Sequence, residues 1–185
     1  MTDSRTILGI DPGTNLLGFG IVRVDGAGKA HYVDMGVLDL RRMPDPYQKL
    51  GIIHEKVGAL CDLHHPDDLA IESPFYGKNA QVIFKLGRAQ GAAMTAAIAR
   101  DISVYEYAPR KAKMAICGNG AASKEQVALI VQKTLGIDID EKYLDATDAL
   151  ALAMCHYYQL TSPLSSLQAA TSWARFIQAN PDRVK

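Results

Sequence analysis

The chain has 185 residues, of which 48% are hydrophobic and 22% charged, and its 20 basic side chains balance its 20 acidic ones. This composition indicates one compact domain and excludes a disordered or low-complexity protein. No apolar run approaches the ~20 residues that cross a bilayer, and no signal-peptide core precedes the first strand-like run. We therefore expect a cytoplasmic protein.

The zero net charge conceals an asymmetry along the chain. Residues 73–133 carry nine basic side chains and three acidic ones, so the remainder of the chain is acidic by the same margin. A basic segment beside acidic ones suits an enzyme on a polyanion. Its lysines and arginines would hold the polyanion while its carboxylates hold metal. The plainer interpretation is that these charges only solvate helix faces.

The first 40 residues are typical of strands. Apolar runs cover residues 7–10, 17–24 and 30–38, and the turns between them contain Pro12-Gly13 and residues 25–28. Such short connections predict three antiparallel strands.

Helices and strands then alternate. Residues 47–63 carry apolar side chains at helical spacing, and His64-His65-Pro66 ends that helix. A strand at 69–72, a helix at 80–100, a strand at 103–107 and further helices follow, so the later strands should run parallel to the first. We predict an α/β fold with a mixed five-stranded sheet flanked by helices over residues 1–160. Residues 161–185 form an extension, either a short docking helix or a mobile tail.

Acidic residues stand where these elements begin or end. The first and fourth strands end on Asp11 and Glu72, and Asp145 and Asp148 share the inward face of a helix that begins near residue 144. A buried carboxylate needs a cation, and a helix dipole supplies only ~0.3–1 kcal/mol. The four acids therefore predict a divalent-metal site, with Mg²⁺ or Mn²⁺ favoured over zinc. Singly, each acid could be a solvated turn or helix-start residue.

Basic and aromatic residues near these acids are candidates for DNA contacts. Arg110, Lys111 and Lys113 follow Pro109, and Lys124 follows a glycine-containing loop and a Ser123–Gln126 capping box. Phe75 and Tyr76 lie between Pro74 and Gly77, where a ring could stack on an unpaired base. The alternative is that both rings pack beneath the next helix.

Four sequence blocks, in this order over residues 6–156, resemble the RuvC-type Holliday-junction resolvases. The blocks are Ile7-Leu8-Gly9-Ile10-Asp11-Pro12-Gly13-Thr14, Ala70-Ile71-Glu72-Ser73-Pro74-Phe75-Tyr76-Gly77-Lys78-Asn79, Leu86-Gly87-Arg88-Ala89-Gln90-Gly91 and Asp145-Ala146-Thr147-Asp148-Ala149-Leu150-Ala151. The resemblance implies an RNase H-like fold and a homodimer. It also implies an endonuclease that nicks two opposing strands of a four-way DNA junction in recombination and repair.

The resemblance also assigns residues to roles. It implies that Asp11, Glu72, Asp145 and Asp148 are the catalytic acids and that they hold Mg²⁺. From the chemistry of phosphodiester hydrolysis we expect two ions, for which Mn²⁺ can substitute, and we assign Asp11 to bridge both of them. Lys113 and Lys124 match lysines beside the active site, although the family often has an acid where this chain has Ser123. A branch-migration complex of the RuvA and RuvB type is the implied partner. The full set of predicted DNA contacts is Phe75, Tyr76, Lys78, Asn79, Arg88, Arg110, Lys111, Lys113 and Lys124.

The helix predicted at 80–100 is rich in alanine, with Gly87 and Gly91 one turn apart. Small residues permit close helix approach. The resemblance favours a dimer contact for this face over tight packing within one chain. A two-fold dimer could present two equivalent acid clusters to opposite strands of the junction.

Three other functions stay open at this point. The turn at residues 11–14 also resembles the first phosphate loop of actin-like ATPases and sugar kinases, but those need a second similar half, and this chain is too short. A non-catalytic junction-binding protein would not need four acids. A related RNase H-like nuclease that cuts RNA–DNA hybrids or another DNA structure is the stronger competitor.

Overall fold

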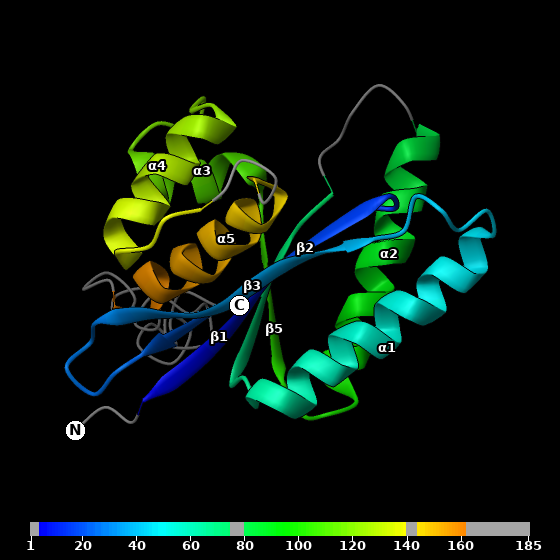
Figure 1. Cartoon of the computed structure of the whole chain (residues 1–185), viewed down its shortest axis with the longest axis horizontal. Coiled ribbons are helices and arrows are strands. Elements are labelled where there is room, and N and C mark those ends of the chain that lie inside the picture. The colour runs from blue at the N-terminus through cyan, green and yellow to red at the C-terminus, as the bar shows by residue number, and fades with distance from the viewer. Residues whose placement is uncertain (1–3, 75–79, 140–143, 162–185) are drawn as a thin grey trace, which may run out of the picture.

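The computed structural model describes residues 4–74, 80–139 and 144–161, and its centre is a five-stranded mixed sheet (Figure 1). The strand order is β3-β2-β1-β4-β5, with β1, β2 and β3 antiparallel and β4 and β5 parallel to β1. The predicted mixed sheet is therefore confirmed. The strands are β1 (Arg5–Asp11), β2 (Leu16–Val24), β3 (Ala30–Asp39), β4 (Asp68–Glu72) and β5 (Ser103–Tyr107).

Helices cover both faces of the sheet (Figure 1). One face carries α1 (Pro46–His64) and α2 (Ala80–Ile98), and the other carries α3 (Pro109–Cys117), α4 (Lys124–Leu135) and α5 (Leu144–Thr161). Local signals explain the helix limits. The Asp45 side chain caps α1 by accepting a hydrogen bond from the Tyr47 backbone N–H, and His65 ends it in the left-handed conformation. The predicted capping box of Ser123 and Gln126 starts α4.

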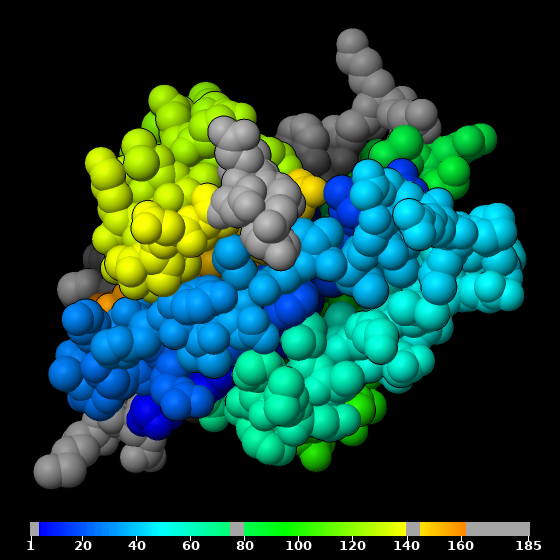
Figure 2. Space-filling view, in the orientation of Figure 1, coloured from blue at the N-terminus to red at the C-terminus, as the bar shows by residue number. Residues whose placement is uncertain are grey.

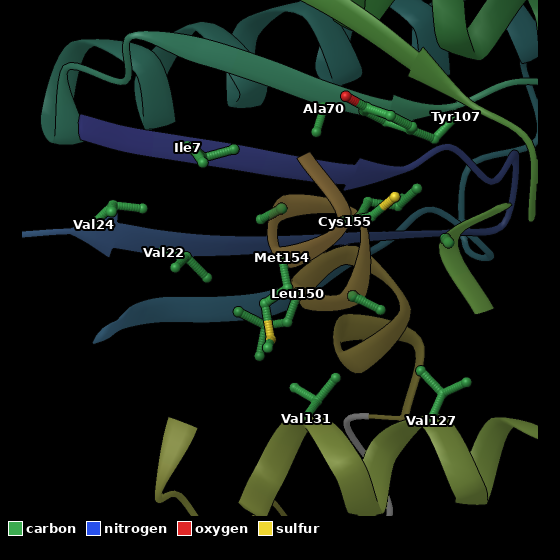
Figure 3. Packing of buried hydrophobic residues seen from close by; sticks show 14 of the residues in the cluster. Ile7, Val22, Val24, Ala70, Tyr107, Val127, Val131, Leu150, Met154 and Cys155 are labelled. Atoms are coloured by element: carbon green, nitrogen blue, oxygen red, sulfur yellow. The ribbon is translucent and has the colours of Figure 1, made fainter. Parts of the chain in front are cut away.

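The sheet separates two hydrophobic cores, because alternate side chains of a strand point to opposite faces. In β1, Ile7 packs with α3, α4 and α5, whereas Leu8 and Ile10 pack with α1 and α2. Val127 and Val131 reach from α4 toward α5, which lies between α4 and the sheet (Figure 3). Helix α5 is therefore covered on both sides.

Glycines in the strands let α5 approach the sheet closely. A Cβ atom on Gly9 would lie 1.9 Å from the Ala149 carbonyl oxygen, and one on Gly18 would lie 2.2 Å from the Asp145 carbonyl oxygen. Only residues without side chains fit at these two positions. This contact places the first turn of α5 beside the end of β1.

The edge strand β3 lies at the surface between α4 and α1 in the space-filling view (Figure 2). None of the helices in the described part of the chain is long and apolar enough to cross a membrane. Helix α5 runs through Thr161, and the rest of the predicted extension at 161–185 lies outside the described residues.

Candidate active site

The sheet register brings two of the predicted acids to one edge. Strands β1 and β4 are parallel neighbours in which Ile10 is aligned with Ile71. Asp11 and Glu72, the next residue of each strand, therefore end side by side at the carboxyl edge of the sheet. A polar site at this edge is usual for parallel strands, since their exposed ends open onto a crevice.

The first turn of α5 supplies the other two acids. A cavity of about 200 Å³ opens at this edge, and Asp148 lines it together with Asp11 and Glu72. The Asp148 side chain is only 17% exposed, while that of Asp145 is 37% exposed and lies outside the lining. Three of the four predicted acids thus share one cavity, and the fourth stands beside it.

Two lysines complete the cavity. Lys124, the first residue of α4, places its Nζ 2.7 Å from Asp148 Oδ2 and 3.1 Å from Asp145 Oδ1. Lys113 of α3 lines the cavity and donates a hydrogen bond of 2.7 Å to the Ala122 carbonyl oxygen. Ser123 is used in the α4 cap, where it exchanges hydrogen bonds with Gln126, and Lys124 bridges the two aspartates.

The acids carry more negative charge than these lysines neutralise. Burial, together with the charges of Asp148 and Asp145, raises the pKa of Asp11 to about 6, although Lys124 opposes the shift. Burial and the charges of Asp11 and Asp148 raise the pKa of Glu72 to about 7. Burial alone would lower the pKa of the Lys124 ammonium. Its hydrogen bonds with Asp148 and Asp145, together with the negative charges of these side chains, raise that pKa overall. The cavity therefore attracts a further positive charge or retains a proton.

The donor atoms around the cavity suit a hard divalent cation. They are carboxylate oxygens, the ligands that Mg²⁺, Mn²⁺ and Ca²⁺ prefer. Within the described residues, no three acidic, histidine or cysteine side chains are close enough together to enclose an ion as they stand. The Lys124 ammonium bridges Asp145 and Asp148, so a cation bound at Asp148 would compete with this ion pair.

The other predicted DNA-contact residues lie apart from the cavity. Arg110 and Lys111 are exposed in the first turn of α3, where the Lys111 ammonium lies 5.1 Å from the centre of the Tyr107 ring. Arg88 of α2 lines a separate cavity. The predicted contacts of Phe75, Tyr76, Lys78 and Asn79 lie outside the described residues and stay predictions.

Gln90 is a buried residue near the site whose role sequence reasoning missed. Its Nε2 donates hydrogen bonds to the Glu72 carbonyl oxygen at 3.3 Å and to Glu106 Oε2 at 2.8 Å. It thereby connects α2 to the ends of β4 and β5. The available signal was a polar residue on the otherwise apolar, buried face of an alanine-rich helix.

Comparisons with known proteins agree with this geometry. The family model of crossover junction endodeoxyribonuclease RuvC matches residues 7–156. A crossover junction endodeoxyribonuclease RuvC of Bacteroides fragilis is 50% identical over 98% of this chain and 96% of its own length. That of Porphyromonas gingivalis is 48% identical over 98% of this chain and 97% of its own length.

Solved structures show the same fold. The Thermus thermophilus RuvC in complex with a Holliday junction substrate superposes with a TM-score of 0.77 at 34% identity, covering 84% of this chain and 94% of that one. The yeast mitochondrial Holliday junction resolvase Ydc2 shares the fold alone, with a TM-score of 0.64 at 12% identity over 88% of this chain and 83% of its own. These neighbours confirm the RNase H-like architecture. From the match of sequence, fold and acid-lined cavity, we conclude that this chain belongs to the RuvC family of crossover junction endodeoxyribonucleases.

Proposed function

We propose that the chain resolves four-way DNA junctions by Mg²⁺-dependent hydrolysis of phosphodiester bonds, with one nick in each of two opposing strands. The observation that carries this proposal is the convergence of Asp11, Glu72 and Asp148 with Lys113 and Lys124 around one cavity. Carboxylates and ammonium groups at one point are what a metal-assisted attack on a phosphate diester requires.

In this proposal the acids hold the metal and the lysines hold the phosphate. Asp11, Glu72 and Asp148 bind two Mg²⁺ ions, for which Mn²⁺ can substitute, and Asp145 completes a ligand shell or orients the attacking water. When bound, the ions supply Lewis-acid stabilisation of the phosphate and lower the pKa of the water. With a metal ion held at Asp148, the Lys124 ammonium would be free to face the scissile phosphate.

Lys113 has a second role in the proposal. Its hydrogen bond to the Ala122 carbonyl fixes the ammonium at the cavity wall and ties α3 to the loop before α4. A lysine has three N–H donors, so at least two remain for phosphate oxygens. A pre-positioned cation needs little reorganisation when negative charge develops in the transition state.

We also propose a homodimer in which α2 contributes to the contact. Phe84 and Ile98 of α2 are 70% and 59% exposed, which is unusual for large apolar side chains on a helix that also packs inside its own chain. A two-fold dimer matches the two-fold symmetry of a four-way junction and supplies one acid cluster for each strand. A branch-migration complex of the RuvA and RuvB type then delivers the junction, in the cytoplasm.

A cleavage assay on three substrates tests the proposed function. Purified protein with Mg²⁺ should nick a synthetic four-way junction at symmetric positions and leave a linear duplex and an RNA–DNA hybrid intact. Preferred cleavage of the hybrid would establish the competing nuclease activity instead. Binding of the junction without cleavage in Mg²⁺ or Mn²⁺ would establish a junction-binding protein and refute the nuclease.

The dimer is tested separately. Light scattering should give twice the mass of the chain, and Phe84→Glu should shift the protein toward the monomer. The monomer should still bind a junction but should lose paired nicking, since one cluster reaches only one strand. A wild-type protein that is monomeric at micromolar concentration and makes paired nicks would contradict this part of the proposal.

A further inference from the structure

A second cavity, which we name the α1–α2 basic pocket, lies next to the active site. Its volume is about 330 Å³, near the lower end of the ~300–1,000 Å³ that ligand pockets occupy. It lies between the β1–β2 loop, the start of α1 and α2. Its polar and aromatic lining residues are Thr14, Asn15, Tyr47, Lys49, Lys85 and Arg88.

The pocket collects positive charge without a compensating acid. None of its described lining residues is acidic. Lys85 and Arg88 are exposed, lie one helical turn apart on α2, and form no ion pair with any described residue. Two like charges at this spacing slightly destabilise a helix, so packing alone gives no reason for them.

Some arginines of the chain are paired within the fold and others are not. Arg5, Arg41 and Arg100 each contact an aspartate, at 2.5 Å, 2.7 Å and 2.6 Å respectively. Those guanidinium groups are satisfied within the fold. Arg88 shares the lack of an ion pair among the described residues with Arg23, Arg42 and Arg110. The Arg88 guanidinium and the Lys85 ammonium are available to an anion from outside.

Lys49 gives the pocket a fixed wall. Its Nζ donates to the Thr14 carbonyl oxygen at 2.9 Å and lies 3.2 Å from Asn15 Oδ1, so α1 holds the β1–β2 loop in place. Two of its three N–H donors are used in this way. The third remains for a bound group.

Both walls of the pocket continue into the active site. Thr14 follows Asp11 by three residues in the chain, and Arg88 precedes Gln90, which bonds to the Glu72 carbonyl, by two. The pocket is therefore built from the loop that follows Asp11 and from the helix that is bonded to Glu72, on the α1 and α2 face of the sheet.

Tyr47 supplies a surface for a base. It lies in the first turn of α1, lines the pocket, and is 69% exposed. An exposed aromatic ring beside unpaired cations is the combination with which proteins bind single-stranded nucleic acid. The small volume limits the occupant to about one nucleotide.

We propose that the α1–α2 basic pocket binds an unpaired nucleotide of the strand next to the scissile phosphate. The base stacks on Tyr47, and the phosphate is held by Lys85, Arg88 and the remaining N–H of Lys49. This assignment rests on the proposed nuclease function and gives the predicted DNA contact of Arg88 a location. Opening of a base pair at the crossover provides the nucleotide.

The charge of the pocket is tested by junction binding at several salt concentrations, without divalent metal so that no cleavage occurs. The double variant K85Q/R88Q should bind more weakly, with the slope of log affinity against log salt reduced by about two. The matched control R23Q/K29Q removes two exposed charges at the opposite end of the sheet and should keep the wild-type slope. Equal slopes for K85Q/R88Q and wild type would overturn the proposal.

The stacking contact is tested with a four-way junction that carries 5-iododeoxyuridine at the crossover. Ultraviolet light should crosslink this base to the peptide that contains Tyr47. Tyr47→Leu should lose the crosslink and weaken binding by ~5- to 150-fold, the range for one stacked base. Tyr32→Leu, on β3 at the far end of the sheet, should retain both.

These outcomes separate the pocket from the catalytic proposal. Wild-type protein that fails to cut junctions refutes the nuclease function whatever the pocket does. Wild-type protein that cuts junctions while Tyr47→Leu keeps full affinity and cuts at the wild-type rate refutes the pocket alone. Crosslinking on a linear duplex as strong as on the junction would also refute it, because a duplex interior offers no unpaired base.

Discussion

Strand β4 has a carboxylate at each end, and the two differ in whether a positively charged partner forms an ion pair with them. Asp68, at the start of the strand, is fully buried and receives hydrogen bonds of 2.5 and 2.9 Å from Arg5, while His156 Nε2 lies 3.1 Å away. Glu72, at the end of the strand, has the acids Asp11 and Asp148 around the same cavity. Within the described residues, Glu72 forms no ion pair.

The pKa values express this difference. Burial alone would raise the pKa of Asp68, but the contacts with His156 and Arg5 bring it below the ordinary value. Burial and neighbouring acids raise the pKa of Glu72 to about 7. The fold can compensate a buried carboxylate where only stability is needed. At the active end it leaves Asp11 and Glu72 without an ion-pair partner among the described residues, which is what a cation-binding site requires.

The largest effect should come from removing an acid at the active end. Asp11→Asn should lower the rate of junction cleavage by ~10³-fold, the upper figure for the loss of one electrostatic group that acts on the reacting phosphate. The variant should fold normally and be no less stable without metal, since repulsion among the acids falls. Single-turnover cleavage and thermal unfolding measure the two effects. Cleavage at the wild-type rate would refute the catalytic role of Asp11.

Removing the acid at the other end should do the reverse. Asp68→Asn should reduce the free energy of unfolding by ~3 kcal/mol, the lower end of the range for breaking a buried ion pair, because Arg5 is 44% exposed and can be solvated. Cleavage by the folded protein should not change. The matched control is Asp62→Asn, which breaks an exposed pair with Arg100 and should leave the free energy of unfolding nearly unchanged. Equal stabilities of the two variants would show that burial of Asp68 contributes nothing.

Lys124 is the only ammonium that bridges two of the active-site acids among the described residues. Lys124→Gln should lower cleavage by about 10²-fold, the lower figure for losing one stabilising donor in the transition state. Metal-free protein should also lose stability, since Asp145 and Asp148 then repel each other without a counter-charge. Lys133→Gln, an exposed lysine in the last turn of α4, is the control and should leave both quantities unchanged. A Lys124→Gln variant with full activity would leave Lys113 as the phosphate-binding lysine.

The two ends of β4 should also respond oppositely to pH. Asp11 and Glu72 bind protons more tightly in the folded chain than in the unfolded chain. The stability that these protons contribute to the fold is full below about pH 4 and is lost as the pH rises through about 6 and 7. The Asp68 contribution is present above its ordinary pKa and is lost as pH falls below about 4. Metal-free protein should therefore lose on the order of 2 kcal/mol of stability between pH 5 and 7.5.

Urea unfolding across this pH range measures the loss. Glu72→Gln should flatten the curve, and Mg²⁺ at pH 7.5 should restore stability to the wild type, because a ligand that binds only the folded state stabilises it. A metal-free wild type that becomes more stable from pH 5 to 7.5 would show that the acids are already compensated.

Most of the fold and part of the site could be predicted from sequence because both depend on local patterns. The strand limits followed from apolar runs and turn residues, and Asp11 and Glu72 were found because each ends such a run. The close approach of α5 to Gly9 and Gly18, which sets the position of Asp148, depends on contacts between distant segments. Asp68 and its partners were not identified either, since Arg5 and His156 are far from it in the chain.

Gln90 is the residue of the site that these local patterns did not reveal, and it gives the smallest expected effect. Its side chain donates to the Glu72 carbonyl from α2, so Gln90→Met should let the end of β4 move and lower the cleavage rate by ~10-fold, the lower figure for losing such a supporting hydrogen bond. Junction affinity should stay the same, because Gln90 is buried and cannot touch DNA.

Glu106 provides the matched control for Gln90. Glu106→Ala removes the second acceptor of the same amide and keeps the bond to Glu72, so it should cleave at close to the wild-type rate. If both variants lose activity equally, the Gln90 amide acts through its bond to Glu106 on β5. In that case its bond to the Glu72 carbonyl is not the one that matters for cleavage. If Gln90→Met weakens junction binding and leaves the rate at saturation unchanged, α2 serves DNA binding alone. A rate defect confined to Gln90→Met would show that the uncompensated end of β4, unlike the Asp68 end, depends on a neutral hydrogen bond for its position.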